Sequence, residues 1–433
     1  MLRTRLHTNR HSRIRGLILA IACVAVVFTG CSEEPRRQVL VWTDVPALLD
    51  YAILFNQDSD TYAVEVASRP DLIGALQSET RVPDLVIGRY LNQAVAEQLF
   101  DEAGTIVSRA GGPQQFYPGF LAMGRFGNVQ RLVPVSFDVP AVLFADALSP
   151  DPEHRLMLEL DAIRSAAGAF NDAGPAGTGV LGYSPLWDTE FLRTLTTSRG
   201  VAFRHGPAGG TLWSTEPLRE TLSFAAEWVF EVNEGPEQSD AFAVRYLTRP
   251  HRDLVRDGRI GFAFVSGSEF LGWPDSQTVG LHARWVAHDG VIFVRDSVVM
   301  AGVPRETSNA QGARAFLNWL LNDDTQQHLI EEARDSGHAR HGIAGGFSSI
   351  IHINERVLLE ARPDLVGRIP PVSVLRWPQR LPHMWPRMRD EAVIPWVRDQ
   401  IRAGNSSESP ETRIQNWLRQ QEPVNRPDSS RNR

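Results

Sequence analysis

The chain has 433 residues, of which 42% are hydrophobic and 22% are charged, and its formal net charge is −7. All 44 basic residues are arginine, which excludes chemistry that needs a lysine, such as a Schiff base or a P-loop phosphate site. The acidic balance argues against nucleic acid or an anionic membrane surface as a partner. The two cysteines, Cys23 and Cys31, both lie near the N-terminus, so the body of the chain has no thiol for a disulfide, a metal cluster or a nucleophile.

The N-terminal segment has the composition of an export signal. Residues 1–15 contain five arginines and no acidic residue, and residues 17–28 form an apolar run that is too short to span a bilayer. The run ends in Phe28-Thr29-Gly30-Cys31, which resembles the lipobox of bacterial lipoproteins, where the cysteine is lipidated. We expect residues 1–30 to be a signal peptide and Cys31 to carry the lipid, with an ordinary signal peptide as the alternative. About 400 residues with a net charge of about −12 would remain, which is enough for two lobes.

After a short polar tether, strands and helices alternate. Apolar or alternating runs predict strands at residues 39–42, 62–67 and 84–88, and helical periodicity predicts helices from 48 to 55 and from 72 to 76. A βαβαβ order within roughly 60 residues is typical of a parallel sheet with crossover helices.

The ends of these strands are candidate binding positions, because ligands of such sheets bind beyond the carboxyl ends of the strands. Trp42 and Asp44 follow the first strand, and Arg89 and Tyr90 follow the third. We expect Asp44 to cap the next helix, although it can also accept a hydrogen bond from a ligand. Arg89 can pair with a carboxylate at the edge of the site or bind ligand oxygens.

Two later apolar strands are interrupted by polar residues. The first covers residues 132–145 and contains Asp138, and the second covers 291–303 and contains Arg295 and Asp296. The other predicted elements are a strand at 261–265 before Ser266, a helix at 308–320 with a Ser308–Gln311 capping box, a helix from Asp324, helical segments up to residue 420 and a disordered tail at 421–433.

The order of these parts resembles the extracellular solute-binding proteins of ABC importers, in particular the group that includes maltose-binding proteins. The resemblance covers residues 39–420, and the order and spacing of its features carry it. The features are the lipobox, the strand ending in Trp42-Thr43, Pro83-Asp84-Leu85-Val86, Val133-Pro134-Val135-Ser136-Phe137-Asp138, Gly258-Arg259-Ile260-Gly261-Phe262-Ala263, and Gly302-Val303-Pro304 before a helix with Ala315-Phe316-Leu317-Asn318-Trp319-Leu320.

The resemblance implies an α/β, two-lobed periplasmic-binding-protein type II fold, in which each lobe is a mainly parallel sheet flanked by helices. A hinge joins the lobes, and the matching crossings fall near Asp138, Arg295 and Gly345. Asp138 and Arg295 could form an ion pair within this hinge. The implied organisation is a signal peptide (1–30), a tether (31–38), lobe one (38–137 and 296–345), lobe two (138–295 and 346–420) and a tail (421–433).

The resemblance also implies a set of ligand-binding residues. Sugar binders of this group often have a tryptophan near the turn after the Gly-rich strand, whereas this chain has only Phe270 and Trp273 there. For the late aromatic position, Trp377 is the alternative to Trp385. The implied ligand-binding residues are Trp42, Asp44, Arg89, Tyr90, Asp138, Tyr183, Trp187, Ser266, Glu269 and Trp385.

The predicted function is that of a lipid-anchored, monomeric solute-binding protein that delivers a small polar solute to a membrane permease. A sugar or oligosaccharide is favoured, because aromatic rings stack on sugars and the chain has eleven tryptophans, although a polyamine or metal ion stays open as the ligand. His338 and His341 could hold a metal, but no third ligand is apparent, so no metal and no cofactor is expected. No catalytic motif is present, and an exported glycan-acting hydrolase and a sensor are the alternatives.

Overall fold

The structure is a computed structural model that describes residues 35–148, 150, 156–174, 179–205, 211–335, 341–404 and 409–421. The predicted signal peptide, the lipidation site Cys31, His338 and the tail beyond residue 421 lie outside these ranges. Within them, no helix has both the length and the apolar character that crossing a membrane requires.

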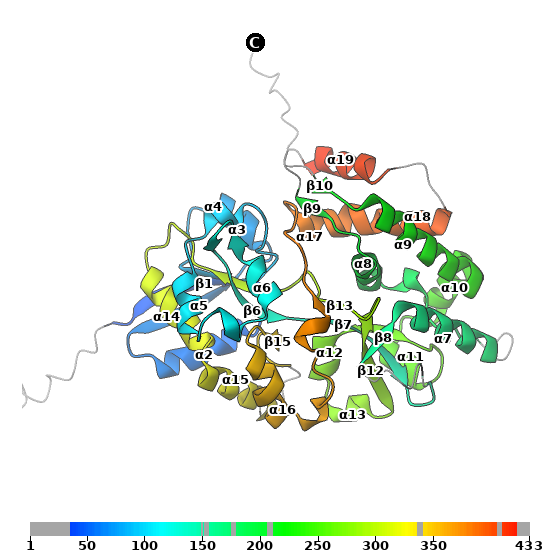
Figure 1. Cartoon of the computed structure of the whole chain (residues 1–433), viewed down its shortest axis with the longest axis horizontal. Coiled ribbons are helices and arrows are strands. Elements are labelled where there is room, and N and C mark those ends of the chain that lie inside the picture. Colours follow the sequence, from blue (N-terminus) through cyan, green and yellow to red (C-terminus); the bar gives the residue numbers. More distant parts are fainter. Residues whose placement is uncertain are drawn as a thin grey trace, which may run out of the picture.

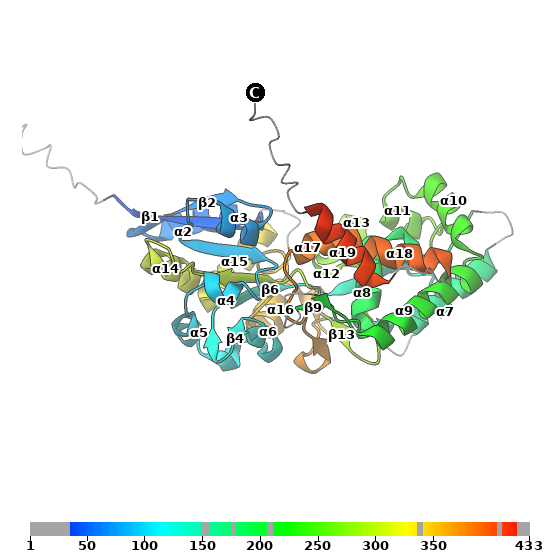
Figure 2. The same cartoon turned by 90° about the horizontal axis from the view of Figure 1, so that it is seen from above.

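The chain forms two lobes that lie side by side, and each lobe is a β-sheet with helices packed around it (Figure 1). The same division is seen when the molecule is viewed from above (Figure 2). The predicted two-lobed α/β fold is therefore confirmed.

The first lobe is built on a six-stranded sheet. In spatial order its strands are β15 (Phe347–Ser348), β6 (Val133–Phe137), β14 (Val299–Gly302), β3 (Leu85–Arg89), β1 (Arg37–Thr43) and β2 (Tyr62–Ser68). The predicted βαβαβ unit is confirmed, since β1 pairs in parallel with β2 on one side and β3 on the other. β14 and β15 run antiparallel to their neighbours, so four of the six strands share one direction.

Helices cover this sheet because each presents an apolar face to it. In α14 (Ala310–Leu320), Phe316 and Leu317 are fully buried. The predicted capping box is wrong: the cap is Asn309, one residue after Ser308, and its side chain accepts a hydrogen bond from the Gly312 N–H (3.0 Å). The other helices of this lobe are α2 (Leu48–Asp58), α3 (Leu72–Ser78), α4 (Ala96–Leu99), α5 (Gly104–Arg109), α6 (Pro118–Met123), α15 (Asp323–Asp335) and α16 (Leu358–Ala361).

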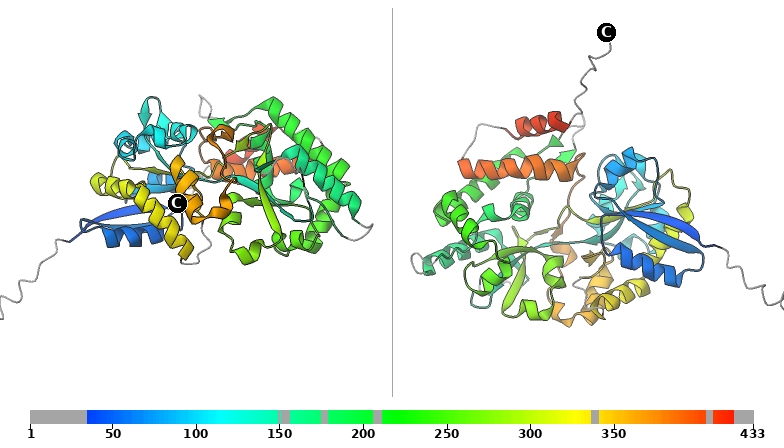
Figure 3. Two further views of the ribbon diagram at one scale, coloured as in Figure 1. Left: turned by 60° about the horizontal axis from the view of Figure 1, so that its bottom comes forward. Right: turned by 180° about the vertical axis from the view of Figure 1, so that it is seen from behind.

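The second lobe is built on a four-stranded sheet of β11 (Ala263–Ser266), β7 (Pro140–Ala145), β12 (Leu281–Ala287) and β8 (Met157–Glu159), in that order. β7 is antiparallel to both of its neighbours, and the other three strands share one direction. The helices around it are α7 (Leu160–Ala173), α8 (Thr189–Ser198), α9 (Thr215–Glu227), α10 (Pro236–Tyr246), α11 (His251–Arg256), α12 (Gly267–Gly272), α13 (Asp275–Thr278), α17 (Trp385–Met388), α18 (Ile394–Ala403) and α19 (Pro410–Gln421). α18 packs against α9, and Figure 3 shows the orange and red C-terminal helices beside the green helices of this lobe.

Smaller ladders complete the structure. They are β4 (Arg125–Phe126) with β5 (Val129–Gln130), β9 (Arg204–His205) with β10 (Thr211–Leu212), and β13 (Ile292–Phe293) with β16 (Leu375–Arg376). The last ladder brings together two segments that lead from one lobe to the other.

The chain passes between the sheets at the predicted polar breaks. Asp138 lies between β6 of the first sheet and β7 of the second, and Arg295 lies between β13 and β14. The Arg295 N–H donates to the Asp138 carbonyl oxygen (3.0 Å), so the two passages are bonded to each other. The predicted lobe limits stay predictions. β15, which follows Gly345, pairs with β6 of the first sheet.

Candidate ligand-binding cleft

A polar cavity of about 360 Å³ lies where the chain passes between the two sheets. The first lobe contributes the loops after β1 and β3 and the end of β6, and the second contributes the first turns of α8 and α12. Its lining residues are Asp44, Arg89, Tyr90, Ser136, Phe137, Asp138, Glu190, Arg193, Ser266, Ser268, Arg295, Ser297, Val299, Ala344, Gly345 and Gly346.

Asp44 and Arg89 are held together at the ends of β1 and β3. The Arg89 N–H donates to Asp44 Oδ1 (3.0 Å), and Arg89 Nη1 donates to the Asp44 carbonyl oxygen (3.2 Å). Asp44 does not cap α2, which begins only at Leu48, so the expectation of a capping role is wrong. Burial raises the pKa of the Asp44 carboxyl, and the hydrogen bond and charge of Arg89 partly oppose this.

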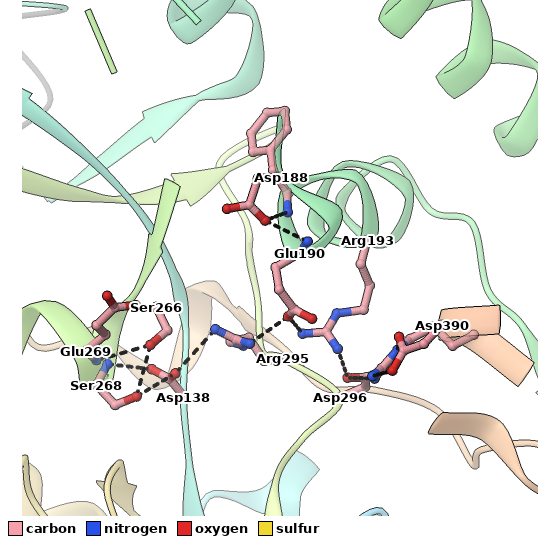
Figure 4. Close-up of polar contacts among 12 residues, drawn as sticks. Asp138, Asp188, Glu190, Arg193, Ser266, Ser268, Glu269, Arg295, Asp296 and Asp390 are labelled. Carbon is pink, nitrogen blue, oxygen red and sulfur yellow. Dashed lines mark hydrogen bonds and ion pairs between the residues drawn. The ribbon is translucent and has the colours of Figure 1, made fainter. Parts of the chain in front are cut away.

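Asp138 joins the first passage to the start of α12 (Figure 4). Its Oδ1 accepts hydrogen bonds from the N–H groups of Val139 (2.8 Å) and Ser268 (2.9 Å), and its Oδ2 accepts from the Ser268 hydroxyl (2.8 Å). Arg295 Nη1 lies 3.8 Å from the same Oδ2 atom. Ser266 caps α12 by accepting from the Glu269 N–H (3.1 Å), so three polar side chains are fixed at one edge of the cavity.

Glu190 connects two arginines on the second-lobe side. Asp188 caps α8 through the N–H groups of Glu190 and Phe191, which orients the first turn of this helix. Arg295 Nη2 donates to Glu190 Oε2 (2.6 Å), and Arg193 pairs with the same carboxylate. Figure 4 shows both arginines converging on Glu190.

Behind this pair, Asp296 is the centre of a buried charge cluster. Arg193 Nη1 (3.1 Å) and Arg389 Nη1 (3.4 Å) lie beside its carboxylate, and Trp385 Nε1 donates to it (2.7 Å). Burial acts to raise the pKa of Asp296, but the two guanidinium groups and the indole hydrogen bond together hold it below its usual value. The residue therefore stays charged and fixes the segment after Arg295.

The structure brings five of the ten predicted ligand residues to the cavity. They are Asp44, Arg89, Tyr90, Asp138 and Ser266. Glu269 lies beside them on the first turn of α12 and outside the lining, and burial raises the pKa of its carboxyl.

The four predicted aromatic residues other than Tyr90 pack against other parts of the protein and do not line the cavity, although Trp187 is only half-buried. Trp42 is 1% exposed and belongs to the first-lobe core, and Tyr183 packs edge-on against Phe191. Trp187 stacks on a phenylalanine, and Trp385 is held by Asp296 as described above. The alternative, Trp377, stacks on Phe120 at 4.9 Å. Packing of a large apolar ring against neighbouring side chains is the common reason for these positions.

Several residues of the cleft were missed in the sequence. Glu190 and Arg193 are spaced by three on α8, which is an ordinary surface pattern and gave no signal. Arg389 lies in a π-helical turn (Arg389–Val393), far along the chain from the other groups. Arg295 and Asp296 did have a signal, since they interrupt an apolar strand, and it was interpreted only as a hinge.

The described residues contain no cluster of three or more side chains suited to a metal ion. His341 is buried, its ring packs edge-on against Phe347 (4.9 Å), and burial lowers its pKa to about 3. Its imidazole is therefore neutral at physiological pH.

This fold is also found in proteins of known structure. No protein-family model and no curated protein sequence matches the chain. Among solved structures, the sugar-binding protein MalE from Xanthomonas citri superposes with a TM-score of 0.63 at 13% identity, over 89% of this chain and 100% of the other. The chain shares the fold of ABC solute-binding proteins.

Two further structures agree with this. MalE from Listeria monocytogenes in complex with maltose has a TM-score of 0.60 at 12% identity, over 89% of this chain and 96% of the other. An ABC substrate-binding protein from the same organism in complex with cycloalternan has a TM-score of 0.60 at 14% identity, over 88% and 97%. The resemblance seen in the sequence is confirmed at the level of the fold.

Proposed function

We propose that this protein is the substrate-binding component of an ABC importer and captures a small polar solute between its lobes. The observation that carries the proposal is the cavity itself: it lies between two separate sheets, at the passages of the chain, and is lined by fixed hydrogen-bonding groups from both lobes. The similar structures named above are described as binding maltose or cycloalternan, which makes a sugar the leading candidate for the solute.

The proposed mechanism is closure of the lobes around the solute. Ligand contacts from both walls favour the closed arrangement, and the closed form docks on the permease. We propose lobes close to the predicted limits, with the third passage moved into the segment before α17. The Asp138–Arg295 pair lies at the passages, so Arg295→Gln should change the extent of closure as well as affinity. No covalent chemistry is part of this mechanism.

We further propose that the protein is exported, is lipid-anchored through Cys31 after removal of residues 1–30, and acts as a monomer at the periplasmic or outer face of the membrane. The apolar run, the lipobox and the short tether support this arrangement. The anchor would keep the binding lobes within reach of a permease.

The experiment is a thermal-shift and calorimetric screen of small solutes, combined with small-angle scattering of the bound and free protein. The proposal expects one solute to raise the melting temperature, to compact the molecule, and to be recovered unchanged. Consumption of the solute would instead support the hydrolase alternative, and a bound form with unchanged dimensions would contradict closure.

A further inference from the structure

The side chains that line the cavity include equal numbers of positive and negative charges. It contains three arginines and three carboxylates. Arg89 Nη1 lies 3.7 Å from Asp44 Oδ2, and Arg295 is bonded to Glu190 at 2.6 Å. Arg193 is likewise paired with Glu190. An ion that enters this cavity finds no unpaired counter-charge on the wall, and would have to compete with these internal pairs.

The cavity also lacks a tryptophan ring among its described lining residues. All eleven tryptophans lie in the part of the chain that the structure describes, and none of them lines the cavity. Its two aromatic lining residues already have partners. Arg389 stacks over the ring of Tyr90 at 5.2 Å, and Phe137 is 2% exposed and packs against Tyr117 and Trp377. A sugar ring therefore finds no tryptophan on which to stack, and one face of the Tyr90 ring is already covered by Arg389.

Hydrogen-bonding groups remain available on the wall. The Nε–H of Arg295 is buried and has no hydrogen-bond partner among the described residues. The Arg89 side chain is 38% exposed, and the Ser297 hydroxyl belongs to the same lining. The hydroxyl groups of Ser266 and Ser268 also line the cavity and can accept a further hydrogen bond, although each already has a partner in the protein. The lining thus contains arginine donors, carboxylate acceptors and serine hydroxyl groups, and this mixture suits solute hydroxyl groups, each of which donates and accepts.

We propose that the cavity takes a small, electrically neutral, polyhydroxylated solute, held at its edges by hydrogen bonds to paired ions and without stacking on a tryptophan. This inference rests on the proposed function and narrows its substrate class. The size of the cavity, about 360 Å³, lies near the lower end of the range of about 300–1,000 Å³ that is usual for ligand pockets, which favours one or two sugar rings over a long oligosaccharide.

Two further carboxylates near the cavity favour a different class of solute, a cation. Asp188 and Glu269 lie outside the lining, and neither forms an ion pair with an arginine within 4.0 Å among the described residues. They make the second-lobe side more acidic than the lining, so a cationic solute is the outcome that the test has to distinguish.

The experiment measures binding by calorimetry and thermal shift for neutral monosaccharides (glucose, galactose, mannose, xylose and arabinose), maltose, maltohexaose, glucuronate, glucosamine and putrescine. Each titration is done at low salt and at about 0.5 M salt, where exposed ionic attraction is screened. We expect a neutral mono- or disaccharide to bind best, with an affinity that changes by less than about twofold with salt. Maltohexaose should bind no more tightly than the shorter sugars.

Two variants refine the test. Asp44→Asn and Glu190→Gln replace charged acceptors by neutral ones and should each weaken the neutral sugar by about tenfold, because hydrogen bonds to charged groups are the stronger kind. Asp101→Asn is the matched control, since this carboxylate also pairs with an arginine, Arg314 (3.0 Å), but lies outside the cavity.

The outcomes separate the two proposals. If glucuronate, glucosamine, putrescine or maltohexaose binds best, the proposal of a small neutral solute is wrong. The proposed function as a solute-binding protein still stands in that case. Absence of binding by the whole panel, with no change in the dimensions of the molecule, counts against both proposals.

Discussion

The hydroxyl group of Tyr90 accepts a hydrogen bond from Arg389 Nη1 at 3.0 Å, and the guanidinium group of Arg389 stacks over the same ring. Tyr90 follows β3 of the six-stranded sheet, and Arg389 follows α17 beside the second lobe. Tyr90 also has a positive φ of 58°, a conformation that costs a non-glycine residue free energy. A strained residue of one lobe is thus held by a buried arginine of the other, at the edge of the cavity.

The Tyr90→Phe variant tests this contact as a latch. Phenylalanine keeps the ring for Arg389 and removes only the hydroxyl acceptor, so the arrangement of the lobes described here should lose about 1–2 kcal/mol relative to arrangements without this contact, a shift of about five- to thirtyfold in their ratio. Fluorescence energy transfer between dyes on the two lobes measures the ratio directly. Tyr62→Phe on β2 is the matched control, and equal inter-lobe distances in wild type and Tyr90→Phe would rule out the latch.

The Gly88→Ala variant tests how β3 positions Asp44. A Cβ atom on residue 88 would lie 2.5 Å from Asp44 Oδ1 and 2.2 Å from Leu72 Cδ1, so the Asp44 carboxylate or helix α3 has to move. We expect a destabilisation of about 1–3 kcal/mol in urea unfolding and a loss of solute binding. Gly104→Ala, whose Cβ would meet only a side-chain atom at 3.5 Å, should leave both unchanged. Full binding by Gly88→Ala would show that the position of Asp44 is not needed.

Local pattern predicted much of the fold, and long-range packing decided the rest. The βαβαβ unit and the two interrupted strands were readable because apolar periodicity reflects burial, and burial is what forms those elements. The position of the Trp42 ring could not be predicted from the sequence. A tryptophan at the end of a strand has the same local sequence whether its ring faces the cleft or packs in the core, and here it is 1% exposed.

The candidate site shows the same division. Asp44, Arg89 and Asp138 stand at strand ends, so topology alone brought them to the cavity. Glu190 and Arg389 arrive from helices that are far away in the chain, and only the packing of α8 and of the turn after α17 brings them close to Arg295 and Asp296. The sequence predicted a stacking site because it is rich in tryptophan, whereas the structure uses those rings for packing.

The Cys31→Ala variant tests the proposed anchor. It removes the only thiol that remains after the predicted cleavage, so no acyl group can be attached. We expect the protein to be released from membranes, to keep its affinity for the solute, and to support uptake poorly. Metabolic labelling with palmitate and fractionation of cells measure the first point. Membrane retention of Cys31→Ala without label would contradict lipid anchoring through this residue.

The Asp296→Asn variant tests the buried charge cluster. The side chain of Asp296 is only 12% exposed and lies beside two arginines that are 7% and 6% exposed, so its neutralisation leaves two buried guanidinium groups undercompensated. We expect a loss of about 3–5 kcal/mol in the free energy of unfolding at neutral pH. Asp101→Asn on the surface of the first lobe should cost no more than about 1 kcal/mol.

The cost of Asp296→Asn should depend on pH. Because the pKa of Asp296 in the folded protein lies below its usual value, the charge stabilises the fold fully above the unfolded pKa of about 3.9, and this stabilisation is lost as the pH falls through the lower folded pKa. The difference in unfolding free energy between wild type and Asp296→Asn should therefore be constant from about pH 5 to pH 7 and shrink in stronger acid. Urea titrations from neutral pH into stronger acid measure this difference in unfolding free energy. A difference that grows in acid would mean that the carboxyl group is protonated in the folded protein and that the two arginines are neutralised by other groups.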